Sequence, residues 1–479
     1  MKLVRLQIVL VITVVGVFAP AQTKPAPKAP SRAESLIQQG LAAGEKQRFA
    51  EAEKDFRAAI RLSPRRPDAH DYLGTLLAMQ QKFDPAIAEF TKAIALDPKF
   101  ASPYFHRGVA ELQKDPTASV ADLQKATGLA PKYAGAFYYL GRAFQAVDRQ
   151  TDAMEAYGKA AELEPNNPAA QKAFGILLQK TGQMDRAIEA FKKNLELTPN
   201  DPDAHNNLGL AYLQTGRADP AIEEFQKATE LAPADASFLG NLAIAHLQKS
   251  DFDTAGQELQ AALKMAPDRA DLHYDLGLDF KLKDQLPEAI AEFQRARELD
   301  PSLPDPPYTL GVTLWQKGDF PAAAEALQAA IKVKPDYAEA YYTLGSVLKQ
   351  MEKLPEAAAA LREAIRLQPD FSGAHTNLAS VLAQMGDAQG AAQERKLAAQ
   401  ILKGKVGEQA ALFDTNSGIR LMNVGDLDGA ISQFEAALKI TPDSPLAHYQ
   451  LGRALQRKGK TQEAAEHLKR AAELDPHYR

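Results

Sequence analysis

The chain has 479 residues, too many for one compact core, so several domains or a repeat array are expected. Hydrophobic residues make up 45% and charged residues 24%, and a net charge of −5 without a long basic stripe argues against nucleic acid as a partner. The absence of cysteine excludes disulfides, thiolate metal sites and cysteine nucleophiles.

The N-terminal 21 residues have the pattern of a secretory signal peptide. Two basic residues precede an apolar run over residues 6–19, and Ala19-Pro20-Ala21 provides a cleavage site before Gln22. An uncleaved membrane anchor is the alternative, but the run is shorter than the roughly 20 apolar residues of a spanning helix. We therefore expect an exported protein, periplasmic or extracellular after cleavage, that meets a membrane only if this segment is uncleaved. Residues 22–32, rich in Pro, Ala and Lys, are expected to form an extended linker.

A period of 34 residues then runs from residue 33 to residue 478. Aligned on its most regular small residue, here called repeat position 8, the period gives thirteen repeats. Alanine recurs at position 20, and a large apolar residue follows in most repeats at position 24. Apolar residues spaced three and four apart predict two amphipathic helices per repeat, and we expect the small residues where those helices cross. The position-8 residues are Gly40, Gly74, Gly108, Gly141, Gly175, Gly209, Ala243, Gly277, Gly311, Gly345, Ala379, Gly418 and Gly452.

The sequence also marks the ends of these helices. A proline ends the second helix in twelve repeats. In six repeats a glycine follows the first helix at position 15, where a left-handed capping residue is expected. These glycines are Gly182, Gly216, Gly318, Gly386, Gly425 and Gly459. Because one helix pair cannot bury its own apolar face, neighbouring pairs must stack into an α-solenoid.

This pattern resembles the tetratricopeptide repeat over residues 33–478. The resemblance implies an all-α fold, a right-handed superhelix of antiparallel helix pairs whose concave groove is lined mainly by the first helix of each pair. Repeats 1–11 are expected over residues 33–405 and repeats 12 and 13 over residues 411–478. An insertion at residues 406–410 separates them, after Lys403 has replaced the usual proline. We expect this insertion to lengthen a helix and to change the course of the array.

One face of the first helices carries aromatic residues that the core does not require. Positions 2, 5, 9 and 12 share this face, and in the family it lines the groove. Aromatic residues on such a face are typical of a binding surface, although the tyrosines can also serve to pack neighbouring helices. The candidates are tyrosines at position 5 with tryptophan and lysines at position 12: Tyr138, Tyr274, Tyr308, Tyr342, Trp315, Lys281 and Lys349.

Two further columns offer polar side chains. Position 6 carries Asn207 and Asn241 in adjacent repeats, and such amides can hold the backbone of an extended peptide. Position 4 carries histidine in five repeats, at spacings that favour packing between helices over a metal site. These histidines are His70, His205, His273, His375 and His448. With no H-E-x-x-H, G-x-S-x-G or Walker motif, we expect neither cofactor nor metal and no enzyme.

Together these features favour an exported, non-enzymatic scaffold that binds a peptide segment or a protein partner in its groove. The alternative is a structural cell-envelope assembly factor, for polysaccharide, pilus or outer-membrane biogenesis, that acts through repeat edges or the convex face. The sequence gives neither the identity of the partner nor the oligomeric state.

Overall fold

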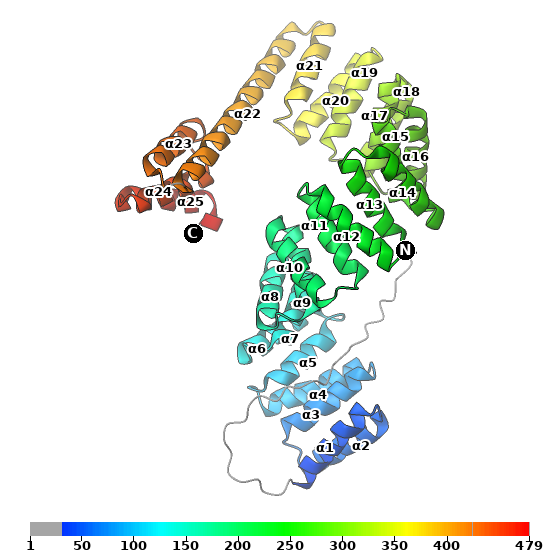
Figure 1. Cartoon of the computed structure of the whole chain (residues 1–479), viewed down its shortest axis with the longest axis vertical. Coiled ribbons are helices and arrows are strands. Elements are labelled where there is room, and N and C mark those ends of the chain that lie inside the picture. The colour runs from blue at the N-terminus through cyan, green and yellow to red at the C-terminus, as the bar shows by residue number, and fades with distance from the viewer. Residues whose placement is uncertain (1–30, 424, 479) are drawn as a thin grey trace. The chain divides into compact units, whose positions relative to one another are not determined.

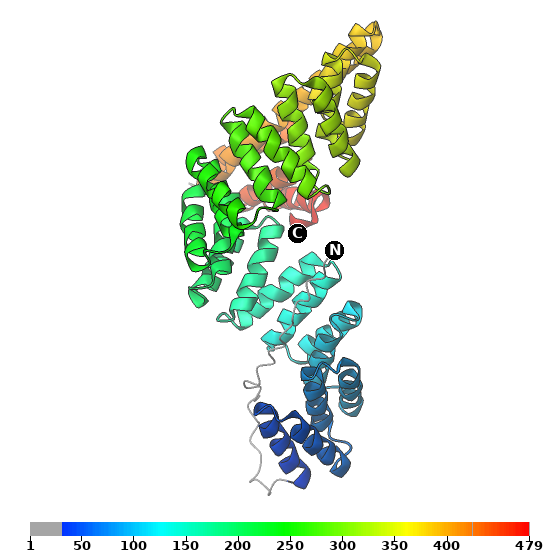
Figure 2. The same ribbon diagram turned by 90° about the vertical axis from the view of Figure 1, so that its right-hand side faces the viewer.

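The computed structural model describes residues 31–423 and 425–478. Within these residues the regular elements are 25 α-helices and one short 3-10 helix, shown in Figures 1 and 2. Successive helices pack as antiparallel pairs, which confirms the predicted all-α solenoid of helix pairs. The predicted signal peptide and nearly all of the predicted linker lie outside the described residues. Arg32, which was assigned to the linker, instead begins the first helix, because the Ser31 hydroxyl accepts a hydrogen bond from the Glu34 amide at 3.2 Å and caps it.

The first of two compact units ends at Met265 and contains repeats 1–6 and most of repeat 7. Its helices are α1 (Arg32–Glu45), α2 (Phe49–Leu62), α3 (Pro67–Met79), α4 (Phe83–Leu96), α5 (Ala101–Glu111), α6 (Pro116–Leu129), α7 (Ala134–Ala146), α8 (Gln150–Leu163), α9 (Pro168–Lys180), α10 (Met184–Leu197), α11 (Pro202–Gln214), α12 (Ala218–Leu231), α13 (Ala236–Gln248) and α14 (Phe252–Met265).

The second compact unit begins at Ala266 and contains repeats 8–13. Its helices are α15 (Ala270–Leu282), α16 (Leu286–Leu299), α17 (Asp305–Lys317), α18 (Phe320–Val333), α19 (Ala338–Gln350), α20 (Leu354–Leu367), α21 (Ser372–Gln384), α22 (Ala388–Asn423), α23 (Leu427–Ile440), α24 (Pro445–Arg457), α25 (Thr461–Leu474) and the 3-10 helix η1 (Pro476–Tyr478). No helix among the described residues is both long enough and apolar enough to cross a bilayer.

The two helices of a repeat meet at the predicted small residues. At Gly277 of α15, an added Cβ would lie 2.6 Å from the Phe293 ring of α16, closer than real Cβ atoms approach a neighbour. Phe293 and the position-20 residue Ala289 are fully buried. The same contact joins Gly209 to Phe225 in unit 1, so the predicted crossing is confirmed and position 24 supplies its large side chain.

The residue at position 15 reverses the chain between the two helices. All six predicted glycines there have φ between 75° and 89°, which confirms their capping role. In six other repeats a residue with a side chain adopts the same left-handed conformation, with φ between 57° and 61°. L-residues are disfavoured there by about 1–2 kcal/mol, because Cβ approaches the following carbonyl oxygen. These residues are Gln47, Gln81, Asp148, Ser250, Asp284 and Glu352.

Replacing Glu352 by glycine is therefore expected to stabilise the fold. The relief of backbone strain exceeds the added entropy of the unfolded chain, which leaves a net gain of about 0.5–1 kcal/mol. The matched control is the reverse change, Gly318→Glu, at the same position of the preceding repeat, which should lower stability. Thermal unfolding followed by circular dichroism checks both, and a lower midpoint for Glu352→Gly would contradict the argument.

Repeats 11 and 12 are joined by one uninterrupted helix. The 36-residue α22 contains the second helix of repeat 11, residues 406–410 and the first helix of repeat 12, as Figure 1 shows. The sequence-based expectation of a lengthened helix is therefore met, since Lys403 does not end the helix as proline does elsewhere. Leu402, Val406 and Phe413 of α22 are 58%, 60% and 66% exposed. These three side chains stay open to solvent in the part of unit 2 that the structure describes.

Candidate functional site

Six of the nine predicted binding residues lie on three consecutive first helices of unit 2. They are Tyr274 and Lys281 on α15, Tyr308 and Trp315 on α17, and Tyr342 and Lys349 on α19. All six side chains are partly buried, so each is reachable from solvent on one side only. We call this set the aromatic face.

Two of the three tyrosines of the aromatic face pack against aromatic residues that end the same repeats. The Tyr308 ring lies 4.9 Å from the Tyr337 ring, and the Tyr342 ring lies 4.7 Å from the Phe371 ring, centroid to centroid. Both pairs are tilted, a favourable geometry for aromatic rings. Part of each tyrosine therefore stabilises the fold, as the packing interpretation proposed. The binding role of the remaining surface stays a prediction.

Polar contacts hold neighbouring first helices in register across the aromatic face. The Tyr274 hydroxyl lies 3.2 Å from the Thr309 hydroxyl, which joins α15 to α17. The Trp315 indole N–H donates to the Gln350 side-chain oxygen at 3.0 Å, which joins α17 to α19. Because their polar atoms are paired within the fold, these two rings can offer a partner mainly apolar surface.

The two lysines add positive charge beside the rings. Burial lowers the pKa of Lys281, because removing the ammonium group from water disfavours its charged form. Among the described residues, neither the Lys281 nor the Lys349 side chain forms a hydrogen bond or an ion pair. A partner that brings a carboxylate to this face would therefore meet ammonium groups that no residue of unit 2 neutralises.

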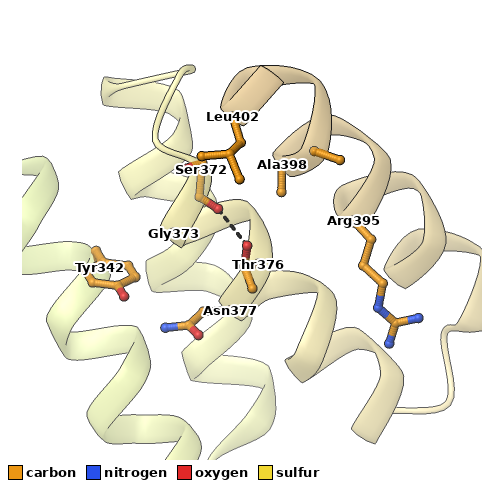
Figure 3. A pocket seen from close by; sticks show the side chains of 9 residues that line it. Tyr342, Ser372, Gly373, Thr376, Asn377, Arg395, Ala398 and Leu402 are labelled. Carbon is orange, nitrogen blue, oxygen red and sulfur yellow. Dashed lines mark hydrogen bonds between the residues drawn. The ribbon is translucent and has the colours of Figure 1, made fainter. Parts of the chain in front are cut away.

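A hollow of about 410 Å³ adjoins the aromatic face where α19, α21 and α22 meet. Figure 3 shows Tyr342 and Asn377 on one side and Leu402, Ala398 and Arg395 on the other. The Asn377 amide already donates to the Ser346 hydroxyl at 2.8 Å. The full lining is Tyr342, Ser372, Gly373, Thr376, Asn377, Arg395, Ala398, Ala399 and Leu402. Of this set, only Tyr342 was among the predicted binding residues.

The other three predicted residues lie in unit 1, where they form no comparable cluster. Tyr138 of α7 packs at 5.5 Å against both the Tyr139 and the Tyr157 rings. The Asn241 amide of α13 donates to the Asn206 side chain at 2.7 Å, so one member of the predicted amide pair is already used within the fold. Asn207 makes no recorded side-chain hydrogen bond among the described residues and keeps its donor and acceptor.

The position-4 histidines form hydrogen bonds that the sequence analysis did not foresee. His205 Nδ1 lies 2.6 Å from a Glu224 carboxylate oxygen, and His205 Nε2 lies 3.1 Å from the Pro199 carbonyl oxygen. A carbonyl only accepts, so Nε2 is the donor to Pro199, and Nδ1 faces the Glu224 carboxylate. His70, His273 and His375 pair in the same way with glutamates 19 residues later: Glu89, Glu292 and Glu394. A histidine at position 4 with glutamate at position 23 was the available signal. No group of three or more metal-ligating side chains occurs within the described ranges.

Repeat 13 departs from this pairing and should respond to pH. His467 occupies the glutamate position, and its Nδ1 lies 2.9 Å from Nδ1 of His448. Burial, followed by repulsion from His448, lowers the pKa of His467. The folded state therefore resists a proton that the unfolded chain accepts near pH 6.5, and stability present above that pH is lost as the pH falls further.

Acidification from pH 7.5 to 5.5 is accordingly expected to reduce hydrogen-exchange protection in α25. His467→Glu restores the pairing of the other repeats and should abolish the loss. Exchange rates must be corrected for the intrinsic effect of pH at each amide. An equal loss in the variant, or none in the unmodified chain, would contradict this account.

Comparison with known families identifies the repeat. Profiles described as "Tetratricopeptide repeat" match residues 37–99, 202–235, 241–304 and 415–479, and one described as "TPR repeat" matches residues 177–216, 314–352 and 345–386. The chain is a tandem tetratricopeptide-repeat protein. The tetratricopeptide fold is that of a protein-interaction scaffold, and in this chain its first helices carry the aromatic face. No curated protein matches the chain significantly.

Solved tetratricopeptide-repeat and related structures resemble parts or most of the chain. YrrB, described as a TPR protein with an unusual peptide-binding site, is 26% identical and covers 37% of this chain and 92% of its own, with a TM-score of 0.35. The pilF protein of Pseudomonas aeruginosa is 20% identical and covers 45% of this chain and 97% of its own, with a TM-score of 0.39. Yeast Tom70 is 16% identical and covers 92% of each chain, with a TM-score of 0.36.

Proposed function

We propose that this tetratricopeptide-repeat protein is an exported, non-enzymatic scaffold that binds a peptide segment with acidic and apolar residues on its aromatic face. The observation that carries the proposal is the juxtaposition in unit 2 of four partly exposed rings with two unpaired lysines. The rings are Tyr274, Tyr308, Trp315 and Tyr342, and the lysines are Lys281 and Lys349. Aromatic side chains commonly anchor protein partners, and unpaired ammonium groups select carboxylates.

Export rests on the sequence alone, on the apolar run that ends in Ala19-Pro20-Ala21. N-terminal sequencing of the protein made in its own host is expected to begin at Gln22. A retained Met1 in a membrane pellet would show that the segment is an anchor.

Selection of peptides from a displayed library on the full chain tests the binding proposal. Enriched peptides should combine acidic with apolar residues, and binding should shift the emission of Trp315, the only tryptophan in the chain. The double variant Lys281→Glu/Lys349→Glu should lose this preference for acidic peptides. The control is Lys317→Glu. Lys317 is an exposed lysine at repeat position 14, at the end of α17, and lies outside the aromatic face. No enrichment, or the same charge preference in the double variant, would rule out this face.

A further inference from the structure

Repeat 12 exposes a surface that every neighbouring repeat of unit 2 buries. In repeats 9, 10, 11 and 13, the first-helix residues at positions 3 and 10 are buried against the preceding repeat. Val347 and Val381 at position 10, for example, are 0% exposed. In repeat 12 these positions hold Phe413, which is 66% exposed, and Arg420, which is also exposed. Repeat 12 therefore has a docking face for a preceding repeat and no repeat on it.

Repeat 11 exposes the complementary surface. Position 24 holds a buried Phe, Tyr or Leu in repeats 1–10 and 12, but in repeat 11 it holds Arg395, which is exposed. Ala399 and Leu402, farther along α22, are exposed too. The hollow of Figure 3 lies on this surface, where the first helix of a following repeat would otherwise pack.

The straight course of α22 is the reason that both surfaces are open. In every other junction of unit 2 a loop lets the next first helix turn back onto the preceding pair. Here the second helix of repeat 11 and the first helix of repeat 12 form one continuous helix. Repeat 12 therefore cannot turn back onto repeat 11, and the two matching surfaces of one chain cannot meet.

A stripe of exposed apolar residues connects the two open surfaces. Ala399, Leu402, Val406, Ala410 and Phe413 are all exposed, and their spacings of three and four residues place them on one side of α22. If two such helices run antiparallel about an axis at Val406, Phe413 faces Ala399 and Leu402 faces Ala410. In both pairs a large side chain then packs against an alanine. The same pairing brings Asp414 within about one helical turn of Arg395, which has the opposite charge.

From this complementarity we infer that two copies of the chain form a two-fold symmetric dimer along α22. Each copy places Leu412 and Phe413 of its repeat 12 in the hollow of the other copy's repeat 11. The partner on these surfaces is a second copy, because each chain carries both surfaces of the contact that joins its other repeats. A two-fold axis lets each copy cover both open surfaces of the other. The exposed apolar stripe is thereby removed from water. This inference does not require the peptide-binding proposal, since Tyr342 is the one residue of the aromatic face that lines the hollow.

Light scattering on the full chain over a concentration series tests the dimer. The expected mass is twice the 52.0 kDa of one chain. Phe413→Asp should weaken association at least about thirtyfold, the effect of removing a central anchor. Leu282→Asp is the matched control, because Leu282 is 57% exposed in the same unit but lies off α22, and this variant should still dimerise. Circular dichroism establishes that both variants are folded.

Disulfide crosslinking locates the two-fold axis of the dimer. An introduced cysteine has no other cysteine in its own chain to react with. Val406→Cys should form a disulfide-linked dimer on mild oxidation, whereas Leu282→Cys should remain a single chain. A mass of one chain at all concentrations would overturn the inference. A dimer that survives Phe413→Asp, or the absence of the Val406 crosslink, would overturn the proposed interface.

Discussion

Replacing Gly277 by alanine should destabilise repeat 8, although alanine is the better helix former. The new Cβ would lie 2.6 Å from Cε1 and 2.7 Å from Cδ1 of Phe293, a ring that is fully buried and has no room to withdraw. Overpacking of this kind costs about 1–3 kcal/mol, more than the roughly 1 kcal/mol of helix propensity gained. The urea midpoint of the chain should fall, with the loss of hydrogen-exchange protection centred on α15 and α16.

A second substitution shows whether the clash is the cause. Repeat 7 pairs Ala243 with Leu259, both fully buried, so the same array already accommodates alanine opposite the shorter side chain. Gly277→Ala/Phe293→Leu should therefore be more stable than the sum of the two single changes predicts, by about 1 kcal/mol or more. Gly128→Ala is the control, because a Cβ at this helical glycine meets no atom within 4 Å. Additive effects of the two substitutions on stability would mean that the residue at position 8 does not limit the size of the residue at position 24.

Replacing Trp315 by alanine should weaken binding of the selected peptides by about 2 kcal/mol or more, roughly thirtyfold in affinity. The indole lies on α17, between Lys281 of α15 and Lys349 of α19, and is the largest ring of the aromatic face. Isothermal titration calorimetry, with Kd and melting temperature measured on the same samples, separates binding from folding. Tyr308→Ala should raise Kd and lower the melting temperature, because the Tyr308 ring also packs on Tyr337.

Two conservative variants refine this test. Gln350→Ala removes the hydrogen-bond partner of the indole and keeps the ring, so affinity should change little. Tyr308→Phe keeps the ring and its packing, so both binding and stability should survive. If Trp315→Ala and Tyr308→Ala lower the melting temperature while affinity is unchanged, the aromatic face serves the fold alone.

The repeated pattern made the fold predictable, because thirteen aligned copies show which positions tolerate only small residues. Gly277 and Gly345 have no room for a Cβ beside the large residue they face, and this steric demand is visible in the sequence as glycine or alanine at position 8 of every repeat. The capping glycines were predictable for the same reason. The six left-handed residues with side chains, such as Glu352, were not, since only the backbone reveals their conformation.

The candidate site was predictable only in part. Spacing along the first helices predicted Tyr274, Tyr308 and Tyr342 on one face, and in the structure they occupy equivalent positions of α15, α17 and α19. Their partners Tyr337 and Phe371 come from the chain that ends each repeat, a stretch without helical periodicity. The hollow at α22 was missed because it depends on which repeat surface is left uncovered. That outcome follows from the path of one helix over many residues rather than from any single position.

The continuity of α22 also determines how the chain responds to proteolysis. Elsewhere in unit 2 adjacent repeats are held together by buried side chains, so a nick in a connecting loop leaves the two fragments associated. Repeats 11 and 12 are connected through one helix, which rises about 1.5 Å per residue. Near its middle this helix carries Gly404, which is exposed, and Gly407, which is partly exposed. Hydrolysis after Lys405 breaks this helix and leaves the Lys405–Asp370 ion pair within the N-terminal fragment. The C-terminal repeats then leave, unless a second copy retains them.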